Sequence, residues 1–159
     1  MTSSNTPTNT RPTLEIYVSD CLSSKELLDQ VLTRHHVKDK RLRYGANGKP
    51  YLKSGELYFS ISHSAGRTIC AVADQEIGAD IQKIAYRPRV ARRICQDHEL
   101  AEANSPAGFT RLWALKESFV KANGAGLAYG LKNIDSHKLK TAKCWRLDDF
   151  FIAICYNRT

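Results

Sequence analysis

The stretch Trp113-Ala-Leu-Lys116-Glu117-Ser-Phe-Val-Lys121-Ala-Asn-Gly-Ala-Gly-Leu127 places a carboxylate and an ammonium one helical turn apart. At 3.6 residues per turn, Trp113, Glu117 and Lys121 share one face of a helix, and we expect Lys116 beside them. A separate stripe at helical spacing predicts the core face, which consists of Leu112, Leu115, Phe119 and Ala122. Taken alone, this pattern also fits an ordinary surface helix, because a Glu–Lys pair at this spacing contributes only about 0.2–0.5 kcal/mol.

Three segments before this helix supply polar residues beside expected strands. Gly48-Lys49-Pro50 continues a turn that begins at Asn47. Ser60-Ile61-Ser62-His63-Ser64 follows the apolar run 57–59, and Ile77-Gly78-Ala79-Asp80-Ile81-Gln82 forms a second strand-like run. Loops and strand ends are where rigid scaffolds carry binding and catalytic residues. Together the segments favour a functional site over an isolated surface helix.

In this order the motifs resemble those of the 4′-phosphopantetheinyl transferases, and specifically the Sfp-type group rather than the compact trimeric enzymes. The resemblance extends from about Lys25 to the C-terminus. It implies an α+β fold with two lobes related as a pseudo-dimer, each a small antiparallel sheet packed on a long helix. We assign residues 14–75 to the N-terminal lobe and 76–159 to the C-terminal lobe of one transferase domain. The chain is shorter than typical members, notably between Gln82 and Trp113.

Local patterns predict the individual elements. A capping box at Ser23 and Glu26 begins a helix that ends near His36. Pro88 opens a helix expected over 88–103, and the main helix begins at Ser105-Pro106 and ends at Gly124. Strands are expected at 14–18, 57–62, 68–73 and 76–82, with a closing hairpin within 144–156. No hairpin is predicted at Asn47-Gly48, because the residues before it are basic.

The resemblance implies transfer of phosphopantetheine from coenzyme A to a serine of an apo acyl or peptidyl carrier protein, with release of 3′,5′-ADP. Such carriers serve fatty acid, polyketide and nonribosomal peptide biosynthesis. Two alternatives remain open: a non-catalytic member that binds coenzyme A or a carrier, and a basic nucleic-acid-binding protein. The chain lacks the interleaved aromatic and basic residues of single-strand binders, which argues against nucleic acid.

Asp80 and Glu117 are the expected ligands of Mg²⁺, which prefers hard oxygen donors and usually takes one or two carboxylates with substrate phosphates. Gln82 stands where members of the family often carry a second acid. Because residues i and i+2 of a strand share a face, its amide oxygen is the expected third ligand. By resemblance Glu117 is also the general base, and Lys121 stabilises phosphate charge and orients Glu117. Trp113 is expected to be a packing residue.

The resemblance also implies contacts to coenzyme A. Lys49 and Pro50 are expected at the nucleotide end, and Ser62 and His63 at the phosphates. Lys25 aligns with a family arginine that binds the 3′-phosphate; a lysine keeps the charge but loses the bidentate fork.

The formal net charge of +8 is unevenly distributed. Residues 1–79 carry ten basic and eight acidic side chains, whereas residues 80–159 carry fourteen and eight. Four arginines fall within seven residues of the second half: Arg87, Arg89, Arg92 and Arg93. Such a patch suits a polyanionic partner, and the resemblance favours an acidic carrier protein.

The remaining composition bounds the compartment. The five cysteines form no CxxC pair and the five histidines no HxxxH, so neither a disulfide framework nor a zinc site is expected. A reduced, cytoplasmic location fits this usage. No apolar run reaches the ~18 residues of a membrane span, and residues 1–13 read as a disordered tail without a signal peptide. We expect a monomer, because two lobes within one chain can supply the cleft.

Overall fold

The computed structural model describes residues 13–126 and 129–157. The predicted tail, apart from Thr13, and Leu127 therefore lie outside the described residues. Within them the strands form two three-stranded antiparallel sheets, with orders β1-β5-β4 and β6-β8-β7, and a small β2-β3 sheet. The strands are β1 (Leu14–Ser19), β2 (Leu42–Tyr44), β3 (Pro50–Leu52), β4 (Tyr58–Ser64), β5 (Arg67–Ala73), β6 (Ile77–Lys83), β7 (Ala142–Leu147) and β8 (Phe150–Tyr156). The helices are α1 (Ser24–Arg34), α2 (Pro88–Ile94) and α3 (Pro106–Asn123).

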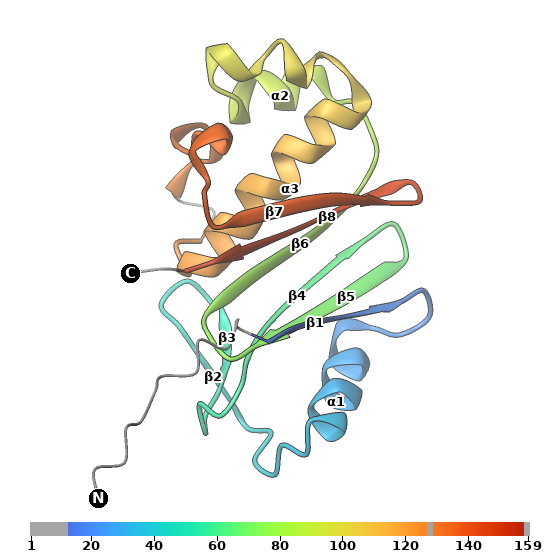
Figure 1. Ribbon diagram of the computed structural model, residues 1–159, viewed down its shortest axis with the longest axis vertical. Helices are drawn as coiled ribbons and strands as arrows, with labels where there is room; N and C mark the ends of the chain where they lie inside the picture. The colour runs from blue at the N-terminus through green and yellow to red at the C-terminus, as the bar shows by residue number, and fades with distance from the viewer. Residues whose placement is uncertain (1–12, 127–128, 158–159) are drawn as a thin grey trace, which may run out of the picture.

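The two larger sheets pack against each other, with α1 and α3 on their outer faces (Figure 1). Strand β5 shows the arrangement, because successive side chains point to opposite faces of a strand. Cys70 and Val72 pack with Leu28 and Val31 of α1, whereas Ile69 faces the second sheet. The core between the sheets is made by Ile69, Ala71, Ala73, Ile77, Ala79, Ile81, Phe150, Ile152 and Ile154.

Helix α3 lies unusually close to β6, and Gly78 makes this approach possible. A Cβ atom at this position would come 2.0 Å from Ser118 O and 2.2 Å from Ala122 N. Any larger residue would therefore push the helix away from the strand. The glycine of the Gly78-Ala79-Asp80-Ile81 motif thus sets the spacing between Asp80 and the helix that carries Glu117.

Serine side chains connect the edges of the two sheets. Ser60 Oγ accepts a hydrogen bond from Ala79 N at 2.8 Å, and Ser64 Oγ accepts one from Lys83 N at 3.0 Å. These hydroxyls satisfy backbone donors of β6 that a neighbouring strand would otherwise bind. Ser62 lies between them on the same face of β4 and therefore points toward β6 as well.

Most predicted elements are confirmed, including the capping box at Ser23 and Glu26, the bounds of α3, and the β7–β8 hairpin. The α+β class with small antiparallel sheets is confirmed, and the pseudo-dimeric relation between the two halves stays a prediction. The β2–β3 hairpin around Asn47 was not predicted.

The predicted helix over 88–103 is wrong, because α2 ends at Ile94. Cys95 is extended and buried, and two short 3-10 helices follow, at Asp97–Glu99 and Glu102–Asn104. The break allows Glu99 to turn into the protein, where it is 0% exposed and binds Lys116 of α3.

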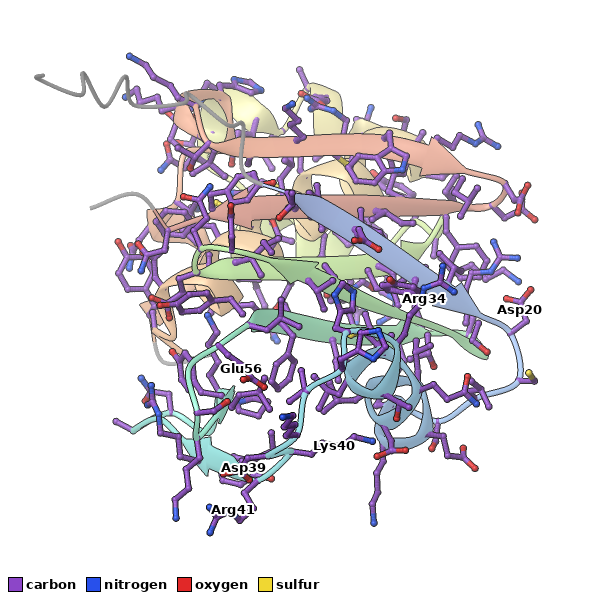
Figure 2. All side chains as sticks on the ribbon, turned by 60° about the horizontal axis from the view of Figure 1, so that its bottom comes forward. Asp20, Arg34, Asp39, Lys40, Arg41 and Glu56 are labelled. Atoms are coloured by element: carbon purple, nitrogen blue, oxygen red, sulfur yellow. The ribbon has the colours of Figure 1, made fainter. Side chains whose placement is uncertain are left out.

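Charges on the segment after α1 are paired locally, as Figure 2 shows for Asp39 and Arg41. Lys40 Nζ lies 2.7 Å from Asp29 Oδ1, and Arg41 Nη2 lies 2.8 Å from Asp39 Oδ2. No helix in residues 13–126 or 129–157 has the length and apolar character needed to cross a bilayer.

Candidate active site

Helix α3 carries two of the reactive side chains, and its ends are fixed by local sequence. Ser105 caps the N-terminus by accepting a hydrogen bond from Gly108 N at 3.0 Å, and Gly124 ends the helix with φ of 59°. Helical spacing brings Trp113 and Glu117 together as predicted: Trp113 Nε1 donates to Glu117 Oε1 at 3.3 Å.

Asp80 of β6 is the centre of the site and is 1% exposed. Its Oδ1 accepts hydrogen bonds from Lys121 Nζ at 2.7 Å and Ser62 Oγ at 2.8 Å. Its Oδ2 accepts from Gln82 Nε2 at 2.8 Å, so the amide nitrogen of Gln82, rather than its oxygen, faces the carboxylate. Lys121 Nζ also donates to Ser62 Oγ at 2.9 Å. Three segments far apart in sequence thus converge on one buried carboxylate.

Glu117 is half-buried beside this cluster, in an unfavourable electrostatic environment. Burial raises its pKa above the usual value, and the charge of Asp80 raises the pKa further. The hydrogen bond from Trp113 and the charge of Lys121 oppose this shift without cancelling it. A carboxyl group of this kind takes up a proton or a cation more readily than an exposed glutamate does.

A cavity of about 380 Å³ opens beside Glu117 and Lys121. Its walls come from three of the four sequence motifs and their neighbours: Asn47, Gly48, Lys49, Pro50, Phe59, Ser60, Ile61, Glu117, Val120, Lys121, Gly124 and Gly126. This volume lies within the range of small-molecule sites. The predicted site residues of the turn and of α3 therefore border one space, and β4 contributes the neighbours of its predicted residues Ser62 and His63.

The two glycines after α3 close one side of the cavity. Both have positive φ, 59° at Gly124 and 68° at Gly126, which favours glycine. A Cβ at Gly126 would come 2.8 Å from Asn47 Cβ, and Asn47 Nδ2 donates to Gly124 O at 2.8 Å. Asn47 is a site residue that the sequence did not identify, since only the fold brings it to the end of α3.

Lys49 lines the cavity, but its ammonium is turned into the protein. It donates to Ala122 O at 3.0 Å, Ile77 O at 3.2 Å and Glu76 Oε1 at 3.3 Å, which uses its three donors. Burial lowers the pKa of Lys49, although the charge of Glu76 opposes the shift. Lys49 therefore joins the turn to β6 and α3, and its contact to coenzyme A stays a prediction.

Lys25 and His63 are exposed and do not line the cavity. They lie near the same end of the first sheet: Thr68 Oγ1 donates to Leu22 O at 3.0 Å, and Thr68 pairs with His63 in the ladder. His63 also shares its face of β4 with Ile61, which does line the cavity. The structure thus brings together Ser62, Asp80, Gln82, Glu117 and Lys121, and leaves Lys25 and His63 outside this cluster.

Lys116 does not lie beside Glu117, contrary to our expectation. It is 0% exposed and donates to Glu99 Oε2 at 2.5 Å and to the carbonyl oxygens of Ile94 and Ile134 at 2.7 Å. Successive helical residues are rotated by about 100°, so adjacent side chains cannot share a face. The adjacency of Lys116 and Glu117 in the sequence could therefore have shown that Lys116 lies outside the site.

Trp113 does more than pack. Its ring lies edge-on to Phe109, with centroids 5.3 Å apart, and the Arg87 guanidinium lies 5.4 Å from its centroid. Trp113, Arg87 and Gln82 line a second cavity of about 360 Å³. The indole therefore contacts both the carboxylate of Glu117 and the second cavity. The i,i+4 spacing of Trp113 and Glu117 in the sequence could have indicated their contact.

Comparison with known proteins finds a matching family and several relatives. The family model of the 4'-phosphopantetheinyl transferase superfamily matches residues 76–156. The 4'-phosphopantetheinyl transferase AcpT of Salmonella typhimurium is 34% identical over 128 residues, which cover 70% of this chain and 65% of AcpT. Sfp of Bacillus subtilis is 33% identical over 116 residues, covering 66% of this chain and 52% of Sfp, and psf-1 of Bacillus pumilus is 31% identical over 127 residues, covering 69% and 54%.

The matched regions thus span between 52% and 65% of these three relatives. The family match alone covers half of the chain and includes Asp80, Gln82, Glu117 and Lys121. The chain therefore belongs to the 4'-phosphopantetheinyl transferase superfamily.

Proposed function

We propose that this chain transfers the 4′-phosphopantetheine group from coenzyme A to a serine hydroxyl of an apo acyl or peptidyl carrier protein. The observation that carries the proposal is the buried Asp80 carboxylate, bound by Ser62 and Lys121, beside a half-buried Glu117 at the edge of a cavity. Family membership supports the same reaction.

The two carboxylates fit a divalent cation. Burial, and after it the charge of Asp80, raise the pKa of Glu117, and a bound cation would relieve the repulsion between the two carboxylates. Asp80 and Glu117 would hold Mg²⁺, and Gln82 would join them if its amide turned its oxygen toward the site. When bound, Mg²⁺ supplies charge neutralisation for the pyrophosphate of coenzyme A.

Glu117 is the proposed general base. It takes the proton of the carrier serine as the serine oxygen bonds to the β-phosphorus, the bond from that phosphorus to the bridging oxygen breaks, and 3′,5′-ADP leaves with the electron pair. The Glu117 oxygen that does not hold Mg²⁺ would accept this proton, because a carboxylate oxygen bound to the metal is a poorer base. The Trp113 hydrogen bond orients the carboxylate, a role we had expected of Lys121.

Lys121 is proposed to stabilise charge on the phosphate oxygens. Its ammonium is held by Asp80 and Ser62, and its side chain is 31% exposed. A cation fixed before the reaction needs little reorganisation as negative charge develops. Ser62 therefore acts through Lys121 and Asp80 as well as through the phosphate contact that we expect of it.

For coenzyme A, we propose that the cavity holds its nucleotide end against Lys49 and Pro50. His63 and Lys25, near the same end of the first sheet, are the proposed contacts of the outlying phosphates. For the carrier, we propose that an acidic surface meets Arg87, Arg89, Arg92 and Arg93, all of which are exposed. The protein is proposed to act as a cytoplasmic monomer.

A direct test incubates the chain with coenzyme A, Mg²⁺ and an apo-carrier and measures the carrier by mass spectrometry. We expect the mass increment of phosphopantetheine on the carrier serine, and its loss in EDTA. Gln82→Glu should tighten the apparent affinity for Mg²⁺ by adding a charged ligand, whereas Gln82→Ala should impair turnover less than Asp80→Ala does.

Binding of coenzyme A without transfer to any carrier would instead favour the non-catalytic alternative. Transfer that persists in EDTA would contradict the metal assignment but not the transferase itself. A stable trimer in light scattering would contradict the proposed monomer.

A further inference from the structure

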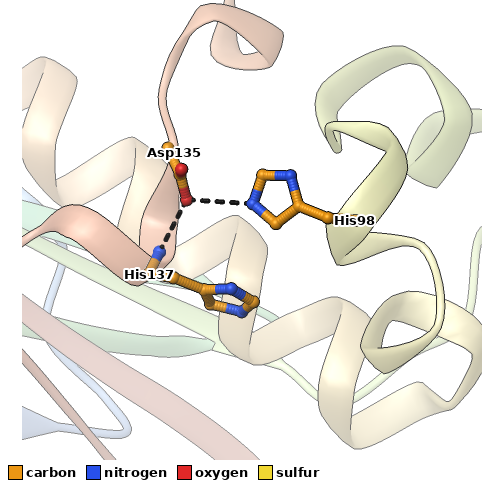
Figure 3. Close-up of side chains that lie close together, drawn as sticks. All are labelled: His98, Asp135 and His137. Carbon is orange, nitrogen blue, oxygen red and sulfur yellow. Dashed lines mark hydrogen bonds and ion pairs between the residues drawn. The ribbon is translucent and has the colours of Figure 1, made fainter.

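A second cluster of metal-ligand side chains lies away from the proposed active site. His98 is on the 3-10 helix Asp97–Glu99, while Asp135 and His137 belong to the segment after α3. Each offers one ligand atom, and these atoms lie within 4.8 Å of one another. Figure 3 shows both imidazole rings beside the Asp135 side chain.

The contacts within the cluster hold donor atoms at suitable separations. His98 Nε2 lies 3.1 Å from Asp135 Oδ1. Two ligands on a tetrahedral zinc ion, with bonds of about 2.0–2.1 Å, lie about 3.3 Å apart. The Asp135 carboxylate is fixed, because it caps its own segment by accepting a hydrogen bond from His137 N at 3.1 Å.

A further carboxylate, that of Glu102, lies beside His137. His137 Nε2 is 3.1 Å from Glu102 Oε2, and the other oxygen of Glu102 binds Arg111 at 2.6 Å. Lys138 Nζ lies 3.3 Å from Asp135 Oδ2 and is 84% exposed, so it can move away when a cation binds. The side chains of His98 and His137 are 49% and 47% exposed, which leaves both rings accessible from solvent.

We propose that His98, Asp135 and His137 form a binding site for a divalent transition-metal ion of the zinc class. Imidazole nitrogen with carboxylate oxygen suits zinc and its neighbours, whereas Mg²⁺ prefers oxygen alone. This site therefore differs in chemistry from the Asp80–Glu117 pair. The proposal departs from our expectation of no zinc site, which rested on local spacing; 37 residues separate His98 from Asp135.

The position of the cluster indicates what the ion would do. Glu99, next to His98, and Ser136, between Asp135 and His137, point inward, and Ser136 N donates to Glu99 Oε1 at 2.9 Å. The segment that carries His98 and Glu99 and the segment 135–137 are joined inside the protein by the Glu99–Ser136 hydrogen bond. The proposed ion would join the same two segments at the surface. We expect bound metal to stabilise the packing of these segments on α3.

The test uses the full chain without a histidine tag, in a Cys21→Ser background that removes the exposed thiol, with excess Mg²⁺ present. Zn²⁺ binding is measured by competition with a chromophoric chelator, and melting temperature is measured with and without Zn²⁺. The test variant is His98→Gln/His137→Gln, since glutamine keeps a hydrogen-bonding group for Asp135. The control is His36→Asn, an exposed histidine at φ of 56°, where asparagine is tolerated.

We expect one Zn²⁺ per chain in the parent protein and in His36→Asn, an affinity weakened by about tenfold or more in the double variant, and a zinc-dependent rise in melting temperature that only the double variant lacks. Should the double variant fail to fold, Asp135→Asn keeps the cap and tests the same loss of affinity. Equal binding by the variants, or no binding by the parent, overturns the proposal and leaves these residues as ion pairs. If only Asp80→Asn loses zinc binding, the proposal is also overturned, because the ion would then bind in the active site.

Discussion

The two faces of α3 carry lysines five residues apart with opposite surroundings. On the buried face Lys116 is 0% exposed and is bound by Glu99 and by backbone carbonyls. On the cavity face Lys121 is 31% exposed and reaches Asp80 and Ser62 beside open space. One short motif thus supplies a structural lysine and a lysine of the proposed site.

The glutamates of the two faces have pKa shifts of opposite sign. Burial alone would raise the pKa of Glu99, but hydrogen bonds from Lys116 and Ser136 outweigh burial and lower it. Burial also raises the pKa of Glu117, and there the net shift stays upward. The buried face is therefore electrostatically satisfied, whereas the cavity face keeps an unfavourable carboxylate that a ligand or proton can relieve.

The largest expected effect is on the cavity face. Glu117→Gln keeps the shape of the side chain but removes the proposed base, so turnover should fall by about 10²–10⁴-fold. Because the substitution also removes a carboxylate whose charge is disfavoured by burial, stability at neutral pH should stay the same or rise. Single-turnover mass spectrometry and urea unfolding measure the two effects. A Glu117→Gln variant that is active but less stable would show that Glu117 has a structural rather than a catalytic role.

The buried face should respond in the opposite way. Lys116→Met leaves Glu99 as an unpaired buried charge, and breaking one side of a buried ion pair costs about 3–5 kcal/mol. Urea unfolding should show this loss of stability, and turnover should fall only as far as the folded fraction does.

The double variant Lys116→Met/Glu99→Gln supplies the control for that prediction. Removing both charges avoids the unpaired carboxylate, so the double variant should be more stable than Lys116→Met alone. If the two were equally unstable, the lost hydrogen bonds from Lys116 to the carbonyl oxygens of Ile94 and Ile134, rather than the unpaired charge of Glu99, would account for the instability.

Acid should weaken the buried face selectively. The pKa of Glu99 is lower in the folded protein than in the unfolded chain, where it is near 4.5. Its stabilising contribution is therefore complete above the unfolded pKa and disappears as the pH falls through the folded value. Glu99→Gln should make stability less dependent on pH in that acidic window. Glu117→Gln should change the dependence in the opposite sense, since its folded pKa is raised. Urea unfolding across this window measures both slopes.

The residues of the cavity face and the apolar residues Leu112, Leu115 and Ala122 could be predicted from the sequence, but the buried partner of Lys116 could not. Helical spacing identified Glu117 and Lys121, and the motif order identified Asp80, because these depend on local geometry and on the family resemblance. The partner of Lys116 lies 17 residues away, beyond a helix break that no local pattern indicated. The role of Gly78 depends on contact between β6 and α3, which periodicity cannot reveal.

The smallest expected effect concerns the exposed surface of α2, the helix that packs on the buried face of α3. Arg89 and Arg93 are exposed there and form no ion pair within the described part of the chain, unlike the paired charges after α1. If they attract an acidic carrier, Arg89→Glu/Arg93→Glu should raise the KM for carrier several-fold and leave the KM for coenzyme A unchanged. Lys140→Glu/Lys143→Glu changes the net charge equally at two other exposed positions and should have a smaller effect.

Salt supplies a second test of the same idea. Exposed charges more than about 8 Å apart are largely screened at physiological salt, so raising the ionic strength further should raise the KM for carrier more in the parent protein than in the arginine variant. Equal loss for both substrates would place these arginines in the coenzyme site or the fold, and equal effects of the two charge reversals would reduce them to part of the general positive charge.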